Sequence, residues 1–208
     1  MAHVLVLHGR LPAGPCDEAY APLLARLPYA KRHELERRDP HARRASLAGI
    51  GLALHGIALL NGGPAEPRGL MFPTGGKPYV PGGPRFSISH GEHHVGVALS
   101  RDCEVGFDLE EVQEPDTAPG ATRETQAAQQ RLVRWTATEA VLKAAARGLR
   151  AVGAVELDGN YAAGRIGASI FRLAPVGIAG TVAHIATDVP ITSLSVQEVP
   201  LSAWPAGS

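Results

Sequence analysis

The segment E-V-G-F-D-L-E at residues 104–110 constrains the fold more than any other part of the sequence. Successive side chains of a strand point to opposite faces, so this pattern predicts a strand that buries its valine, phenylalanine and leucine on one face. Asp108 and Glu110 then share the other face, with their backbones about 7 Å apart from the rise of a strand. Two neighbouring carboxylates repel each other unless a cation or protons intervene. The acidic face is therefore either solvated or the site of a bound cation.

Two long helices are predicted from hydrophobic spacing. The apolar residues that recur at steps of three and four are Leu47, Ile50, Leu54 and Ile57. They place one apolar stripe on a helix within residues 31–60, where Pro40 either interrupts the helix or begins a second one. Another helix is predicted over residues 126–146 and ends before Gly148.

Short apolar segments bounded by turns predict the strands. These segments are residues 4–7, 85–89, 94–99, 104–109, 169–173, 181–186 and 191–196. Each half of the chain thus contains a long helix followed by strands. We expect an α+β fold of two similar halves, residues 1–102 and 103–208, related by a pseudo-two-fold axis. Each half would pack its long helix on a small, mainly antiparallel sheet, and the polar residues 111–125 would form an exposed excursion.

Charge and composition narrow the class of partner. The 20 basic and 20 acidic side chains of this 208-residue chain cancel, so no overall field favours nucleic acid or a membrane surface. Two cysteines are too few for a disulfide framework and suit a reducing cytosol. Residues 1–7 are too short for the core of a signal peptide, and no apolar run approaches the roughly 20 residues that span a bilayer. We expect a soluble, cytoplasmic protein that works as a monomer.

The segment W-T-A-T-E-A-V-L-K at residues 135–143 carries a second group of functional side chains. Trp135, Glu139 and Lys143 are four residues apart and lie along one face of the predicted helix. A Glu–Lys pair at this spacing is often only a helix stabiliser worth a few tenths of a kcal/mol. The tryptophan on the same face indicates that this face points inward or into a cleft. Glu139 could then add a third carboxylate to a metal site, and Lys143 a cation beside bound phosphates.

Three further segments have both a structural and a functional interpretation. The strand F-S-I-S-H ends at His90, which could be a structural hydrogen-bonding group or a phosphate ligand. The G-G-K-P sequence at residues 75–78 is a tight turn by default. The basic residues ahead of the apolar stripe are Lys31, Arg32, Arg37, Arg38, Arg43 and Arg44. They form either a solvated helix face or a binding site for a phosphate group.

Taken in order, these segments resemble the signature of the phosphopantetheinyl transferase superfamily. The likeness is closest to its pseudo-dimeric type, which activates nonribosomal peptide and polyketide synthases. Residues 76–78 match the G-K-P turn of the family and residues 86–90 match its F-N-x-S-H motif. Residues 106–110 match G-x-D-x-E, and residues 135–143 match W-x-x-K-E-A-x-x-K. The resemblance extends over residues 76–149, and four motifs in the family's order make it specific.

The resemblance implies a magnesium-dependent transfer of the phosphopantetheine arm of coenzyme A, a co-substrate, to a serine of an apo carrier protein. The carriers would belong to fatty acid, polyketide or nonribosomal peptide synthases, and 3′,5′-ADP would be released. Asp108, Glu110 and Glu139 would hold Mg²⁺, and Lys143 would neutralise the departing phosphate. The proton of the serine would pass to Glu139 or to a metal-bound water.

The coenzyme A site is also implied by the resemblance. His90, with Lys31 and Arg44, would grip the phosphates, above all the 3′-phosphate of the ribose. Arg44 begins an R-x-S-L-type helix found in the family. The residues implied to line the adenine site are Gly76, Lys77, Pro78 and Ser89. Asp108 and Lys143 would contact the diphosphate, and the catalytic residues would be Glu139, Lys143 and His90.

Three positions depart from the family pattern. Thr138 stands where the family has a lysine before the helix glutamate, but it points roughly 100° away from Glu139 around the helix. Ser87 replaces the asparagine of F-N-x-S-H, and residues 111–134 lack the phenylalanine-rich helix that many relatives place near the carrier. Two alternatives stay open: a magnesium-dependent hydrolase of coenzyme A or a related diphosphate, and a non-catalytic relative that binds carrier proteins.

Overall fold

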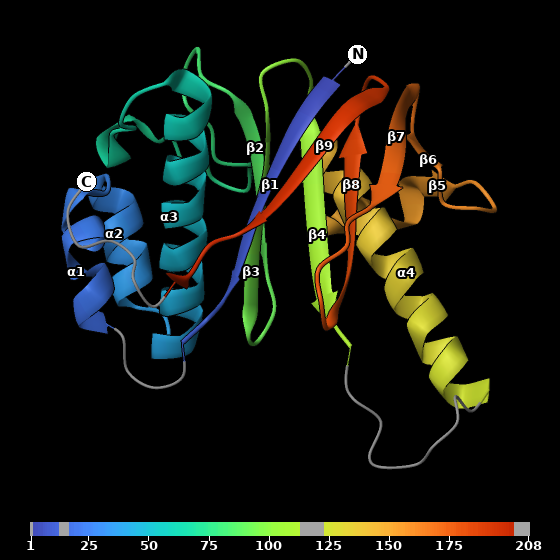
Figure 1. The fold of residues 1–208 in the computed structure, drawn as a ribbon, viewed down its shortest axis with the longest axis horizontal. Helices are drawn as coiled ribbons and strands as arrows, with labels where there is room; N and C mark the ends of the chain where they lie inside the picture. The colour runs from blue at the N-terminus through green and yellow to red at the C-terminus, as the bar shows by residue number, and fades with distance from the viewer. Residues whose placement is uncertain (1, 13–16, 113–122, 202–208) are drawn as a thin grey trace.

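The structure is a computed structural model that describes residues 2–12, 17–112 and 123–201. It is a mixed α+β fold with two sheets, as Figure 1 shows. The strand order is β2-β3-β1-β9 in the first sheet and β4-β8-β7-β6-β5 in the second. All neighbouring strands run antiparallel except β1 and β9, which are parallel. The α+β class expected from the sequence is therefore confirmed.

The elements follow in chain order. In the first part they are β1 (Ala2–Arg10), α1 (Asp17–Arg26), α2 (Tyr29–Glu36), α3 (Pro40–Asn61), η1 (Pro67–Gly69), β2 (Arg85–His90) and β3 (His94–Ser100). In the second part they are β4 (Val105–Glu111), α4 (Arg123–Ala144), η2 (Leu149–Ala154), β5 (Val155–Leu157), β6 (Ala163–Ile166), β7 (Ser169–Pro175), β8 (Thr181–Thr187) and β9 (Ile191–Glu198).

Helix α3 is the core helix of the first layer. It begins at Pro40, whose ring suits the first helical position, and the Asp39 side chain caps it by accepting a hydrogen bond from the Ala42 amide (3.0 Å). It ends at Gly62, which has a φ of 71°. The predicted apolar stripe is buried against β1, β2 and β3. By length and composition α3 could cross a membrane, but 67% of the apolar window is buried inside the protein, which accounts for its hydropathy.

Helix α4 covers the second sheet and lies closest to β4 and β8. The close approach depends on Gly106. A Cβ atom at this position would lie 1.9 Å from the Ala140 carbonyl oxygen and 2.4 Å from the Ala144 nitrogen, both in the backbone of α4. Only glycine permits this contact, which places the inner face of α4 directly on the acidic face of β4.

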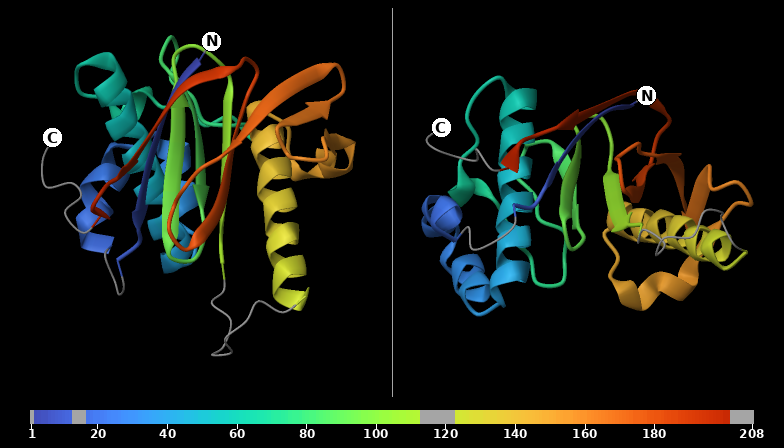
Figure 2. Two further views of the ribbon diagram at one scale, coloured as in Figure 1. Left: turned by 45° about the vertical axis from the view of Figure 1, so that its right-hand side comes forward. Right: turned by 60° about the horizontal axis from the view of Figure 1, so that its bottom comes forward.

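The two sheets meet where the edge strands β2 and β4 lie side by side, as the two views in Figure 2 show. Between β2 and β4, backbone amides of β4 donate hydrogen bonds to side chains of β2 instead of to its backbone. Ser87 Oγ accepts a hydrogen bond from the Phe107 amide (3.0 Å), and Ser89 Oγ accepts one from the Leu109 amide (3.4 Å). The apolar face of β4 packs in a core that also contains Val4 of β1, so the interior is continuous across the junction.

The boundary expected between residues 102 and 103 falls between β3 and β4, which belong to different sheets. The last strand does not stay with the second sheet: β9 returns and pairs with β1. The predicted strands and long helices are present, but the sequence did not predict α1, β5 or β6. Residues 113–122 of the expected polar excursion lie outside the described residues.

Candidate active site

Asp108 is the centre of the acidic face of β4. Asp108 is 2% exposed, and its Oδ1 accepts hydrogen bonds from Ser89 Oγ (2.7 Å) and from Lys143 Nζ (2.6 Å). Its Oδ2 is buried and has no hydrogen-bond partner among the residues that the structure describes. A buried carboxylate oxygen without a partner is unfavourable, so a ligand that contacts Oδ2 would be stabilised here.

Helix α4 brings Glu139 and Lys143 to Asp108. The ammonium of Lys143 lies 3.7 Å from Glu139 Oε2 and donates to Ser89 Oγ at 3.1 Å. Burial, followed by the charge of Asp108, raises the pKa of Glu139, and the charge of Lys143 offsets only part of this rise. Glu139 is thus a carboxyl group that holds its proton more strongly than an exposed glutamate.

Glu110 is the third carboxylate and lies on the same face of β4 as Asp108. Its Oε1 accepts a hydrogen bond from Trp135 Nε1 (3.1 Å), which joins the strand to α4 one turn before Glu139. Burial and the charge of Asp108 raise the pKa of Glu110, whereas the bond from Trp135 lowers it. The structure therefore places the predicted Trp–Glu–Lys face of the helix against the predicted acidic face of the strand.

The donor set of Asp108, Glu110 and Glu139 fits a divalent cation such as Mg²⁺, which prefers oxygen ligands. The partnerless Oδ2 of Asp108 supports this fit. As the side chains stand, no three His, Cys, Asp or Glu groups in the described part of the chain enclose an ion. In this arrangement Lys143 donates a hydrogen bond to Asp108, and Trp135 donates one to Glu110.

His184 is a buried part of this site that no sequence motif indicated. It lies on β8 directly opposite Asp108 in the strand register and is 5% exposed. Its Nδ1 is 2.7 Å from the hydroxyl of Thr136 on α4. Burial lowers the pKa of His184, and the charge of Asp108 opposes this effect. The only signal in the sequence was a histidine within a predicted strand, and the register that places it beside Asp108 could not be known.

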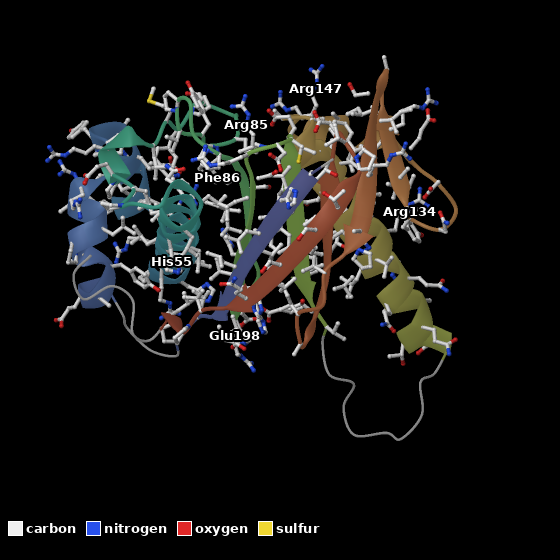
Figure 3. The ribbon with its side chains drawn as sticks, turned by 45° about the horizontal axis from the view of Figure 1, so that its top comes forward. His55, Arg85, Phe86, Arg134, Arg147 and Glu198 are labelled. Carbon is white, nitrogen blue, oxygen red and sulfur yellow. The ribbon has the colours of Figure 1, made fainter. Side chains whose placement is uncertain are left out.

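A cleft of about 840 Å³ lies between α2, α3, the end of β2 and the loop of residues 68–78. Its polar wall includes Lys31, Arg38, Ser46, Arg68 and His90. Its apolar wall includes Pro28, Ile50, Phe72, Pro78 and Ile88. A smaller lobe of about 240 Å³ shares the glycines and proline of residues 75–78 with this cleft and extends to Lys143 and Arg147. Arg147 and Arg85 lie along the same edge of the molecule, opposite Glu198 (Figure 3).

Glu34 organises the cations on the wall of the cleft. Lys31 Nζ donates to both Glu34 oxygens at 3.1 Å and lies 5.2 Å from the centre of the Phe72 ring. Arg38 donates to Glu34 Oε1 (2.6 Å) and to Ser46 Oγ (3.0 Å). Arg44 lies partly buried on α3 and does not line the cleft. Arg38 is thus the arginine of the basic cluster that faces the cleft with Lys31.

His90 ends β2 at the mouth of the cleft. Burial, and then the positive charges of Lys143 and Arg38, lower the pKa of its imidazole. The same neighbours would favour an anion beside it. Ser89 points the other way, to Asp108 and β4, and lines neither part of the cleft.

Lys77 has a different environment from the other cations. Its Nζ donates to the Val105 carbonyl oxygen (2.8 Å) and lies 3.5 Å from Glu104 Oε2. Burial lowers its pKa, although Glu104 counteracts this. These contacts fix the loop of residues 75–78, with Gly76 and Pro78, to the start of β4. Lys77 also lines the smaller lobe.

No family model matches this chain, and no curated protein is similar to it. The interpretation of the site therefore rests on its geometry and on the motifs of the sequence.

Proposed function

We propose that this protein is a magnesium-dependent phosphopantetheinyl transferase that moves the phosphopantetheine arm of coenzyme A to a serine of an apo carrier protein. One observation carries the proposal. Motif residues separated by more than a hundred positions, from Lys31 to Lys143, line the cleft and the smaller lobe, which have Gly75, Gly76, Pro78 and Ile88 in common. Lys143, which lines the smaller lobe, contacts Asp108.

The polar residues that line the cleft suit the phosphates of a nucleotide such as coenzyme A, and the apolar residues suit its base. Lys31, Arg38 and His90 provide donors for a phosphate, and charge-assisted hydrogen bonds to phosphate are strong. Phe72 and Pro78 offer apolar surface for a flat base. Lys143, at the smaller lobe, would then meet the diphosphate between the nucleoside and the pantetheine arm.

The carboxylates Asp108, Glu110 and Glu139 would hold magnesium, which when bound offsets the negative charge of the diphosphate. The serine oxygen of the carrier forms a bond to the phosphorus that bears the pantetheine arm, and the bond from that phosphorus to 3′,5′-ADP breaks. Lys143 neutralises the phosphate of the departing 3′,5′-ADP. Glu139 accepts the serine proton.

The proposal includes the two-half architecture expected from the sequence. Helices α3 and α4 are both 22 residues long, and each covers a sheet that is mainly antiparallel. Two related halves with the cleft at their junction would allow one chain to form the complete site. We therefore propose a cytoplasmic monomer whose partners are carrier proteins of fatty acid, polyketide or nonribosomal peptide synthases.

The test is mass spectrometry of several apo carrier proteins after incubation with the protein, coenzyme A and magnesium. We expect one carrier to gain a single phosphopantetheine, and chelation by EDTA to prevent the gain. Release of 3′,5′-ADP without any carrier would indicate the hydrolase instead. Binding of a carrier with no gain in mass on any of them would indicate a non-catalytic relative.

A further inference from the structure

We propose that Lys143 and a divalent cation exchange at Asp108, so that the metal and a phosphate-bearing ligand bind cooperatively. This inference rests on the proposed function, because it concerns the same carboxylates and the same cleft. It adds a property that the transfer reaction does not require: occupation of one site sets the affinity of the other.

The contacts of Lys143 carry the argument. Its ammonium lies 2.6 Å from Asp108 Oδ1 and 3.7 Å from Glu139 Oε2, so it contacts two of the three candidate metal ligands. The Asp108 side chain is 3% exposed and fixed by Ser89, whereas the Lys143 side chain is 27% exposed. When the two separate, the lysine is therefore the group that moves.

A cation and an ammonium on the same carboxylate repel each other, since both carry positive charge. A divalent cation that binds both oxygens of Asp108 therefore displaces Lys143 from Oδ1. The smaller lobe gives the lysine a destination, because Lys143 itself lines it. Phosphate groups in this lobe would stabilise the displaced ammonium, and a lysine held there would leave Asp108 and Glu139 without their present counter-charge.

Binding of either ligand thus raises the affinity of the protein for the other. The coupling must be reciprocal, because the same free energy links the two binding events in either order. Lys77, the other partly buried lysine of the smaller lobe, cannot exchange with the cation in this way. It is held by the Val105 carbonyl and by Glu104, away from the carboxylate cluster.

Trp135 offers a direct reporter of metal binding, because its indole N–H donates to Glu110. The chain has two tryptophans, so Trp204→Phe leaves Trp135 as the single fluorophore. Mg²⁺ is titrated into this variant with and without coenzyme A, and no carrier protein is needed. We expect coenzyme A to tighten Mg²⁺ binding about tenfold, within the usual range of coupling between sites.

The decisive variant is Lys143→Met, which keeps the aliphatic stem and removes the charge. Without coenzyme A it should bind Mg²⁺ about tenfold more tightly than the parent. Coenzyme A should then tighten Mg²⁺ binding by less than it does in the parent, because only the direct attraction between the metal and the phosphates remains. Arg150→Met is the matched control: it removes one positive charge from η2, just beyond the end of α4, and should leave the Mg²⁺ affinity nearly unchanged. Lys143→Gln is a second variant without the charge, and circular dichroism on both variants shows whether they are folded.

The inference is overturned if Lys143→Met and Lys143→Gln bind Mg²⁺ no more tightly than the parent, or if coenzyme A tightens Mg²⁺ binding as much in them as in the parent. In that case the transferase proposal stands as long as the parent binds Mg²⁺ and modifies a carrier. If neither parent nor variants bind Mg²⁺ under any condition, the metal site and the exchange both fail.

Discussion

Both faces of β4 are buried at the centre of the strand, but they differ in whether their polar groups have partners. On one face Val105, Phe107 and Leu109 are at most 1% exposed and pack in a continuous apolar core. On the other, Asp108 is 2% exposed, has a partnerless oxygen and raises the pKa of two neighbouring carboxyl groups. The first face stabilises the fold, whereas the second keeps unfavourable electrostatics that a ligand would relieve. Burial alone therefore does not distinguish a core from a site.

The comparison predicts its largest effect on the apolar face. Phe107→Ala should lower the free energy of unfolding by about 3–5 kcal/mol, because it removes a fully buried ring and leaves a cavity. Urea denaturation measures the change. Ile170→Ala, at a residue that is 55% exposed, is the control and should change stability by no more than about 0.5 kcal/mol. A small effect of Phe107→Ala would mean that this face is not the core of the strand.

The acidic face should respond in the opposite way to Asp108→Asn. The substitution removes one charge of a repelling cluster and also the partner of Lys143. Because the Lys143 side chain is 27% exposed and still lies 3.7 Å from Glu139, we expect only a small change in stability. Carrier modification should fall by a factor of about 10²–10³, the usual effect of removing one electrostatic group from an active site. Denaturation and mass spectrometry on the same preparation separate the two effects. Full activity in this variant would exclude Asp108 from the site.

The alternation of residues 104–110 predicted correctly which residues share each face and that the apolar face is buried, because a strand has only two faces and the side-chain period is fixed. The helical spacing of Trp135, Glu139 and Lys143 likewise predicted a shared face that meets β4. These are local patterns. They were informative because the elements carrying them are regular and the chemistry of their residues is specific.

The remaining features depend on contacts between distant parts of the chain. His184 lies 76 positions after Asp108, and only the β4–β8 register brings them together. The return of β9 to β1 joins the two ends of the described chain, which no local pattern indicates. The basic cluster was recognised, but Arg38, in the connection between α2 and α3, lines the cleft, whereas Arg44 on α3 does not.

A smaller effect is expected at the hydrogen bond beneath the acidic face. Thr136→Val keeps the shape of the side chain but removes the partner of His184 Nδ1, and a buried polar atom without a partner costs about 1–3 kcal/mol. Urea denaturation should show this loss. In the double variant with His184→Phe the losses should not add, since both remove the same bond. Additive losses would mean that the contact contributes nothing to stability.

The smallest effect is the pH dependence of stability at two glutamates, Glu139 beside Asp108 and Glu111 at the end of β4. Burial and the charge of Asp108 raise the pKa of Glu139 above its ordinary value of 4.5. Burial acts in the same direction on Glu111, but hydrogen bonds from the His93 and His94 amides hold its pKa below 4.5. One carboxyl group is thus favoured in its protonated form and the other in its charged form.

The two shifts predict stability changes of opposite sign. The proton on Glu139 stabilises the folded protein fully below pH 4.5, and this contribution declines as the pH rises through the raised pKa. Glu139→Gln should therefore gain stability relative to the parent as the pH rises above 4.5. The charge on Glu111 stabilises the fold above pH 4.5, and this contribution is lost as the pH falls through the lowered pKa. Glu111→Gln should therefore be less stable than the parent above pH 4.5 and approach it at lower pH. Urea denaturation in EDTA across this range measures both differences, and equal signs would show that the two carboxylates do not differ as the geometry requires.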